Sequence, residues 1–345
     1  MISQSESGLS HFIIKSIIHG PAWLVFFLVM TPRAFGLVVQ YQTVNAGLTG
    51  TEIREIRDGK LAGFRYENSF IGTRNFEEGF VTNIVTKTSS IEKFPSSVST
   101  QIYAISTTDN NRYGGMVYFG ENFPTRVYGF LRGSDGGYSF AEPPNVSNSS
   151  VEGIYGNISV GWAVQNGKRS GFFRVDSATN SSYFKIDYNK AGFAAPTYTE
   201  ATGVFGDVVV GTTIINGITY GFGCNISTGA FSDPFLAPSS TATFFNDYND
   251  GLIAGTATIG GVNTPFLLDP STNQPEYFIS PQGYSASGRS YDNGILAGSY
   301  TTSSGEKLGF YANVPEPNIN TLFFVGAIFL FLTRHIVNSR SSISL

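Results

Sequence analysis

Two short stretches that recur in a fixed order decide the fold, and Gly156-Asn-Ile-Ser-Val-Gly161 followed by Gly171-Phe172-Phe173 is a clear example. The first stretch is a turn and a short β-rich segment that ends in glycine, and the second begins about ten residues later. Asn-Gly and Asp-Gly supply the positive φ that a tight turn needs, and the terminal glycine permits a bend or the close approach of another backbone. The two stretches therefore predict a β-hairpin.

This hairpin pattern occurs six times along the chain. The first stretch is found at 58–63, 115–120, 156–161, 206–211, 250–255 and 293–298. The second stretch centres on Phe80, Phe130, Phe172, Phe222, Phe266 and Phe310, at an average spacing of about 46 residues. We expect these six phenylalanines to pack at equivalent positions between neighbouring units.

Further strands complete each unit. A third strand is predicted over 137–142, 183–188 and 275–280, and the segment that leads to the next turn gives a fourth. Four short strands in about 46 residues is typical of a propeller blade. The sequence therefore predicts an all-β fold, a six-bladed β-propeller over 37–313. A β-sandwich and a β-solenoid compete with it, but a sandwich gives no reason for sixfold repetition and solenoid coils are usually shorter.

The last unit ends near Asn313 without its third strand. Residues 38–44 have the pattern of that missing strand, so we expect the N-terminal strand to complete the sixth blade and close the ring. The units resemble the HAF-type repeats of exported bacterial proteins, with Gly-Phe in place of the His-Ala-Phe core.

Composition excludes several classes of function. A net charge of −4 argues against nucleic-acid binding, which needs a basic stripe. All three histidines lie outside 37–313, which excludes histidine-based catalysis and nearly all zinc and iron sites. We expect no cofactor and no metal. The single cysteine, Cys224, cannot form an internal disulfide, and we expect it to be a buried thiol.

Residues 1–36 have the pattern of a secretory signal peptide. Lys15 precedes an apolar run over 21–30, and Ala34 and Gly36 place small residues where a signal peptidase cleaves. An uncleaved membrane anchor is the alternative, but the run is short for a membrane span. We expect cleavage after Gly36.

Residues 314–345 form a distinct tail. Val314, Pro315, Glu316 and Pro317 precede a twelve-residue apolar run over 321–332, and Arg334 follows it. Twelve helical residues span about 18 Å, against about 30 Å for a bilayer core. The run can therefore insert only marginally, with Arg334 on the cytoplasmic side.

This tail resembles the PEP-CTERM sorting signal, which has a Pro-Glu-Pro triplet, a short hydrophobic helix and terminal basic residues. The resemblance implies recognition and cleavage near the triplet by an exosortase. It implies a protein that is membrane-anchored by this helix until it is processed. It also implies an association with exopolysaccharide and biofilm matrix, at the cell surface or outside the cell.

With histidine absent, an enzyme here would depend on carboxylates. Asp58, Asp207, Asp250 and Asp292 are candidates, but they occur in the repeated turns, where aspartate is favoured for backbone geometry. A calcium loop starting at Asp247 is rejected, because its twelfth position is Thr258 and not glutamate.

We therefore expect a non-enzymatic exported surface or matrix protein and hypothesise polysaccharide as its ligand. The alternative is a carboxylate-dependent glycoside hydrolase. The hydrolase predicts two acids about 5–10 Å apart in one groove, one with a raised pKa, whereas the matrix protein predicts no such pair.

Overall fold

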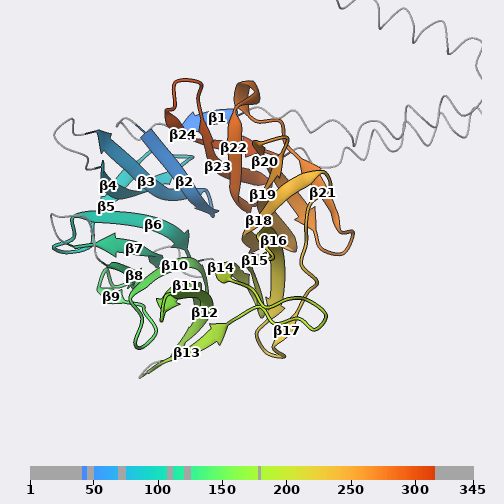
Figure 1. Ribbon diagram of the computed structural model, residues 1–345. Coiled ribbons are helices and arrows are strands. Elements are labelled where there is room, and N and C mark those ends of the chain that lie inside the picture. The colour runs from blue at the N-terminus through green and yellow to red at the C-terminus, as the bar shows by residue number, and fades with distance from the viewer. Residues whose placement is uncertain are drawn as a thin grey trace, which may run out of the picture.

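The chain folds into antiparallel β-sheets arranged around a central axis (Figure 1). This computed structural model describes residues 41–44, 50–68, 75–106, 112–119, 126–177 and 180–314. The fold is all-β, as the repeated turn-and-strand pattern predicts. The expected signal peptide over 1–36 and the C-terminal helix over 321–332 lie outside the described residues.

The strands fall into six groups of four. The first group is β2 (Gly50–Arg57), β3 (Lys60–Asn68), β4 (Asn75–Asn83) and β5 (Ser89–Glu92). The second is β6 (Ser99–Ile105), β7 (Tyr113–Tyr118), β8 (Val127–Arg132) and β9 (Tyr138–Phe140). The third is β10 (Asn148–Tyr155), β11 (Ile158–Gln165), β12 (Lys168–Asp176) and β13 (Ser181–Ile186).

The fourth group is β14 (Tyr198–Phe205), β15 (Val208–Ile215), β16 (Ile218–Asn225) and β17 (Ala230–Phe231). The fifth is β18 (Ser240–Asn249), β19 (Leu252–Ile259), β20 (Val262–Asp269) and β21 (Gln274–Tyr277), followed by the short 3₁₀ helix η2 (Pro281–Gly283). The sixth is β22 (Ser285–Asp292), β23 (Ile295–Thr301), β24 (Lys307–Asn313) and β1 (Tyr41–Val44).

Each group is a four-stranded antiparallel unit of the propeller-blade type. Four units are separate sheets, and the fourth and fifth are joined by one parallel pair, Thr219 with Ala242. The innermost strands are in contact in turn around the axis: β2 with β6, β6 with β10, β10 with β14, β14 with β18, β18 with β22, and β22 with β2. The predicted third strands correspond to β9, β13 and β21, the outermost strands of their units.

The N-terminal strand belongs to the last unit. β1 pairs antiparallel with β24, from Tyr41 opposite Ala312 to Val44 opposite Gly309. The expected pairing is therefore present for residues 41–44, while residues 38–40 lie outside the described part of the chain. Strands from the two ends of the domain thus share one sheet (Figure 1).

The terminal glycine of each repeat lies against the innermost strand. A Cβ atom added there would come within 1.9–2.6 Å of a backbone carbonyl oxygen of that strand, closer than any side chain can approach. Each of these glycines is also paired with a repeated phenylalanine on the next strand outward. The pairs are Gly63–Phe80, Gly115–Phe130, Gly161–Phe172, Gly211–Phe222, Gly255–Phe266 and Gly298–Phe310. The predicted close backbone approach is confirmed.

The second unit corrects one detail of the repeat alignment. The sequence pattern over 115–120 predicts that Gly120 is the terminal glycine of this unit. In the structure Gly115 pairs with Phe130 and therefore takes that role, in the middle of β7. The connection before β7, residues 106–112, contains no glycine, whereas the corresponding turn of every other unit does, so the sequence pattern places the turn at Gly115 inside the strand.

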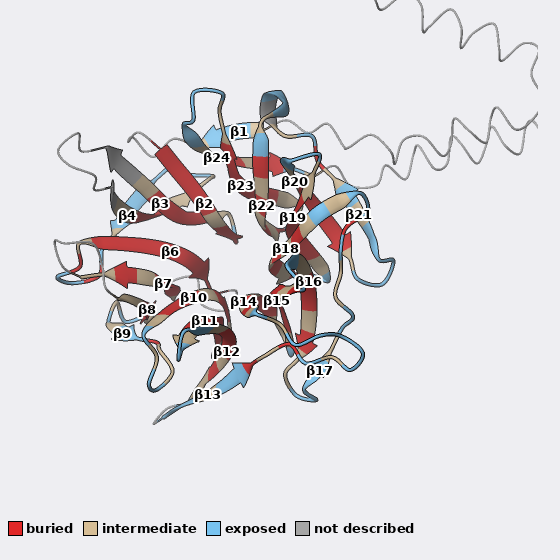
Figure 2. Cartoon of the chain, viewed as in Figure 1, coloured by how far each residue is buried: buried red, intermediate tan, exposed pale blue. Residues whose placement is uncertain are grey.

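The six phenylalanines are all buried, with at most 2% of their surface exposed. Five of them belong to apolar clusters that join two neighbouring units, such as Phe80 with Ala297 and Phe130 with Ala62. Every junction between neighbouring units has such a cluster. Burial is greatest on the inner strands and least on the outer strands (Figure 2).

The residue before each repeated phenylalanine faces the next unit. A Cβ atom on Gly221 would lie 2.5 Å from the Phe245 ring, so glycine makes room for that ring. Where proline replaces this glycine, at Pro265, the opposing residue is Gly288. The small residue has moved to the other side of the junction, which explains why Pro265-Phe266 departs from the repeat.

Other local expectations can be compared with the structure. Cys224 is buried, as expected. Asp58 and Asp250 have positive φ in tight turns and are followed by glycines with positive φ, so they are turn residues as interpreted. The described strands and loops contain no helix long and apolar enough to cross a membrane.

Candidate functional site

A β-bulge interrupts each of the six innermost strands at the same place. At this place the register skips one residue of each strand, opposite the repeated glycine of the second strand, and β18 has a further irregularity between Ser240 and Ala242. The skipped residues are Arg54, Tyr103, Glu152, Thr202, Asn246 and Arg289. A bulge bends its strand and redirects a side chain. All six of these side chains line one central pocket.

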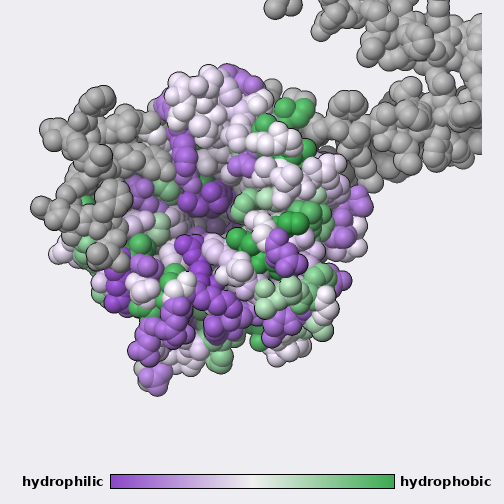
Figure 3. Space-filling model, viewed as in Figure 1, coloured by the Kyte–Doolittle hydropathy of each residue, from purple (hydrophilic) through white to green (hydrophobic). Residues whose placement is uncertain are grey.

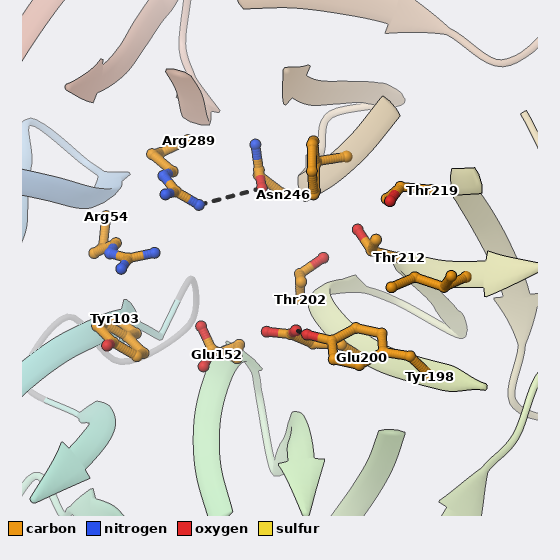
Figure 4. Close-up of a pocket in the computed structure, with 12 residues that line it drawn as sticks. Arg54, Tyr103, Glu152, Tyr198, Glu200, Thr202, Thr212, Thr219, Asn246 and Arg289 are labelled. Atoms are coloured by element: carbon orange, nitrogen blue, oxygen red, sulfur yellow. Dashed lines mark hydrogen bonds between the residues drawn. The ribbon is translucent and has the colours of Figure 1, made fainter. Parts of the chain in front are cut away.

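The pocket lies at the centre of the molecule and is polar. Figure 3 shows a hollow at this place with hydrophilic surface around it. The cavity has a volume of about 320 Å³. Its remaining lining residues are Tyr198, Glu200, Thr212, Ile214, Thr219 and Phe244, from β14, β15, β16 and β18. Figure 4 places Arg54 and Arg289 across the pocket from Glu152 and Glu200.

The cationic wall is built by the first and sixth units. Arg54 lies over the Tyr103 ring, with its guanidinium carbon 4.5 Å from the ring centroid, and pairs with Glu52 at 2.9 Å. Arg289 lies 3.6 Å from the same carboxylate oxygen, and Lys307 lies 3.2 Å from the other oxygen. Three cations therefore share the Glu52 carboxylate.

The acidic wall is built by the third and fourth units. Burial, and secondarily the nearby charge of Glu200, raise the pKa of Glu152 to about 7, while Glu152 accepts a hydrogen bond of 2.9 Å from the Trp162 indole. Glu200 accepts a hydrogen bond from the Tyr198 hydroxyl and lies 3.4 Å from Arg169. Two carboxylic acids thus face one pocket and one has a raised pKa, two features that the hydrolase alternative predicts and the matrix-protein interpretation does not.

A second polar cluster is buried and structural. The Arg57 guanidinium on β2 pairs at 2.8 Å with both Glu55 and Asp247, the latter on β18, and donates to the Ser290 hydroxyl on β22. Burial raises the pKa of Glu55 well above its usual value, and the charge of Arg57 beside it opposes this effect. The cluster joins the first, fifth and sixth units.

The predicted acids and sorting residues lie elsewhere. Asp58, Asp207 and Asp250 lie in turns, and none of the four predicted acids lines the central pocket. Asp292 is the exception to the turn interpretation, because it ends β22, is buried, and accepts hydrogen bonds from Asn249 and the Asp58 amide.

Of the predicted sorting residues, Val314 follows β24, where its amide donates to the Gly294 carbonyl at 2.7 Å. Pro315, Glu316, Pro317 and Arg334 lie outside the described residues, as do the predicted cleavage residues Ala34 and Gly36. Within the part of the chain that the structure describes, no cluster of three histidine, cysteine or acidic side chains is placed to hold a metal ion.

Reasoning from the sequence missed the central pocket, although a signal was present. In five units the bulge residue precedes the repeated glycine by nine residues, as Arg54 precedes Gly63 and Glu152 precedes Gly161. Aligning the repeats on that glycine would have placed these residues in one column. The column carries a different residue in most units, so it had no pattern to attract notice.

Comparison with known proteins supports the fold. A Trypanosoma rangeli sialidase in complex with sialic acid superposes with a TM-score of 0.51 at 9% identity, over 83% of this chain and 60% of the sialidase chain. TolB from Acinetobacter baumannii has a TM-score of 0.48 at 12% identity, over 74% of this chain and 64% of its own.

The β-propeller domain of the Pyrococcus furiosus trilobed protease has a TM-score of 0.47 at 8% identity, over 79% of this chain and 97% of its own. The chain thus spans less than two thirds of the TolB and sialidase chains. No protein-family model and no curated protein matches the sequence.

The sheets and the superposition define the class: this chain has a β-propeller fold.

Proposed function

We propose that the protein is an exported cell-surface or matrix component, a six-bladed propeller closed by its N-terminal strand, that binds polysaccharide in its central pocket. A signal peptide over 1–36 directs export. The tail over 314–345 anchors the chain transiently in the membrane until an exosortase-type enzyme processes it near Pro315–Pro317. The observation that carries the binding function is the polar pocket formed by the six bulge residues.

The groups in this pocket suit a sugar. Carboxylates, an amide and threonine hydroxyls accept or donate hydrogen bonds to sugar hydroxyls, and tyrosine rings offer apolar faces for the sugar ring. The volume is at the lower end of the range of about 300–1,000 Å³ that is typical of ligand pockets, which fits a single sugar residue of a longer chain.

Affinity electrophoresis tests the binding function. Matrix polysaccharide of the producing bacterium in the gel should retard the wild-type protein. Thr219→Trp, which fills the pocket from β16, should migrate unretarded. Ser303→Trp, in an exposed turn, should behave as the wild type. Equal retardation of both variants, or none for the wild type with any fraction, would contradict the proposal.

Intact mass tests the processing. Protein recovered from the surface or medium should begin near Leu37 and end near the Pro-Glu-Pro triplet. A species that retains its C-terminus would mean that the tail is only a membrane anchor.

A second candidate is a carboxylate-dependent carbohydrate-active enzyme, and the Glu152–Glu200 pair favours it. A carboxylic acid with a raised pKa beside a second carboxylic acid is the pairing that glycoside hydrolysis uses. Two observations place it second. Trp162 hydrogen-bonds to Glu152, and Tyr198 and Arg169 contact Glu200, so both carboxylates have protein partners that hold them in place.

Reducing-end release from the same polysaccharide separates the two candidates. A binding protein releases none. A hydrolase releases reducing ends, and Glu152→Gln, which removes the acid, should lower the rate by at least about 10²-fold.

A further inference from the structure

The two arginines of the central pocket lie on neighbouring units and share one counter-ion. Arg54 on β2 and Arg289 on β22 both pair with the same Glu52 oxygen, at 2.9 and 3.6 Å, and β2 and β22 are in contact. Lys307 adds a third cation at 3.2 Å from Glu52. Glu77 is a further acid near Arg54, and burial raises its pKa. Of these groups, Arg54 and Arg289 line the pocket, whereas Glu52, Glu77 and Lys307 lie outside its lining.

The hydrogen-bonding capacity of the Arg289 guanidinium is only weakly satisfied by its neighbours. Its contacts with Glu52 and Asn246 are 3.6 and 3.4 Å long, against about 2.7–2.9 Å for a good charge-assisted hydrogen bond. Its Nε atom is buried and has no hydrogen-bond partner among the described residues. Burial, and then the charge of Arg54, lower the pKa of Arg289 to about 10. An anion bound at this guanidinium would supply the missing hydrogen-bond acceptor and would stabilise the charged form of Arg289.

The opposite wall needs a different kind of ligand group. Glu152, Glu200 and Thr202 face the arginines across the pocket (Figure 4). Carboxylates accept hydrogen bonds from hydroxyls but repel anions. The complementary ligand is therefore anionic at one end and hydroxylated at the other.

We propose that the pocket binds an acidic sugar residue, with its carboxylate held by Arg54 and Arg289 and its hydroxyls directed to Glu152 and Glu200. This inference rests on the proposed polysaccharide binding and adds the class of sugar to it. A sulfate ester on a sugar would offer the same negative charge, so the test has to separate the two anions.

The test measures Kd by calorimetry for the full chain with three soluble probes: galacturonic acid oligosaccharides, their methyl esters, and a sulfated galactan oligosaccharide. The ester keeps the sugar ring and removes only the charge. We expect the acid to bind at least about 10-fold more tightly than the ester, the usual effect of one charge-assisted hydrogen bond. The sulfated probe should bind no better than the ester.

Two variants locate the effect. Arg289→Met should lose the 10-fold preference for the acid, and a urea unfolding curve like that of the wild type should show that the variant is folded. Arg126→Met, which removes an arginine paired with Glu142 outside the pocket, should keep the preference.

The outcomes are distinct. Equal affinity for acid and ester overturns this inference and leaves polysaccharide binding intact. Tighter binding of the sulfated probe overturns the carboxylate assignment. Failure of all three probes, together with no retardation by matrix polysaccharide, overturns the proposed function itself.

Discussion

Two sets of equivalent positions in this propeller behave in opposite ways. The pairs of glycine and phenylalanine on the second and third strands keep the same residues in all six units. The bulge position on the innermost strand varies, with two arginines, a tyrosine, a glutamate, a threonine and an asparagine.

The difference has a physical origin. In every unit the glycine allows the close approach of two backbones and the phenylalanine fills the junction with the next unit. Because this packing requirement is the same six times, the same two residues are found six times. The bulge residues face a shared cavity, where six different groups can surround an asymmetric ligand. Positions that keep the same residue in all six units therefore indicate a role in packing. Positions that vary between units, such as the bulge position, indicate the binding site.

The largest expected effect is at a repeated glycine. Gly211→Ala places a Cβ atom 2.0 Å from the Glu200 carbonyl oxygen, which cannot move without shifting the bulge. We expect a loss of more than about 4 kcal/mol in the free energy of unfolding, or no folded protein. Gly223→Ala on β16 is the matched control, because its nearest neighbour is Ser232 Oγ at 3.7 Å. Similar urea unfolding curves for the two variants would contradict the proposed requirement for glycine at position 211.

Arg57 is an exception to this rule, because it occurs in one unit only and yet its contacts join the first, fifth and sixth units. Arg57→Met leaves Asp247 buried without its cation, which should cost about 3–5 kcal/mol in urea unfolding. The double variant with Asp247→Asn should recover part of the loss. Lys185→Met, at an exposed pair with Asp187, should cost less than about 1 kcal/mol. Equal losses for Arg57 and Lys185 would mean that the buried cluster does not join the units.

Truncation of the repeated phenylalanines should give six similar effects. Phe222→Ala and its five equivalents should each cost about 3–5 kcal/mol, because each ring is fully buried. Phe193→Ala, whose side chain is 45% exposed, should cost about 0.5 kcal/mol or less. Thermal unfolding followed by circular dichroism measures these effects. A Tm equal to that of the wild type for all six Phe→Ala variants would disprove the shared packing role.

The smallest expected effect concerns the pocket and depends on pH. The pKa of Glu152 rises from 4.5 to about 7 in the fold. As pH rises between these values, the unfolded chain releases the Glu152 proton first, so the folded state loses stability relative to the unfolded state. The destabilisation by Glu152 is therefore greatest above pH 7.

Glu152→Gln removes that penalty and can keep the bond from Trp162. Its Tm should match the wild type near pH 4.5 and exceed it by several degrees at pH 8, where the penalty is fully present. Glu306→Gln, in an exposed turn, serves as the control. A Tm difference that is the same at both pH values would contradict the assignment of Glu152.

The fold could be predicted from the sequence because its determinants are local and repeated. Asp58-Gly59 and Gly171-Phe172 carry their structural meaning in two adjacent residues. The second unit was misaligned because Gly115 lacks that local context. The Arg57–Asp247 pair joins residues 190 positions apart, and no local pattern marks either partner. The pocket residues follow a fixed offset, but their function depends on which side chains face each other across the axis.

The pairing of β1 with β24 also sets an order in time. A chain that emerges N-terminus first, from a ribosome or a translocation pore, presents residues 41–44 long before residues 309–312 are available. The sixth unit is therefore the last to form, because β1 has no partner strand until almost the whole domain has emerged. In the described part of the chain β1 has four residues, and so short an unpaired strand is a poor template for other chains.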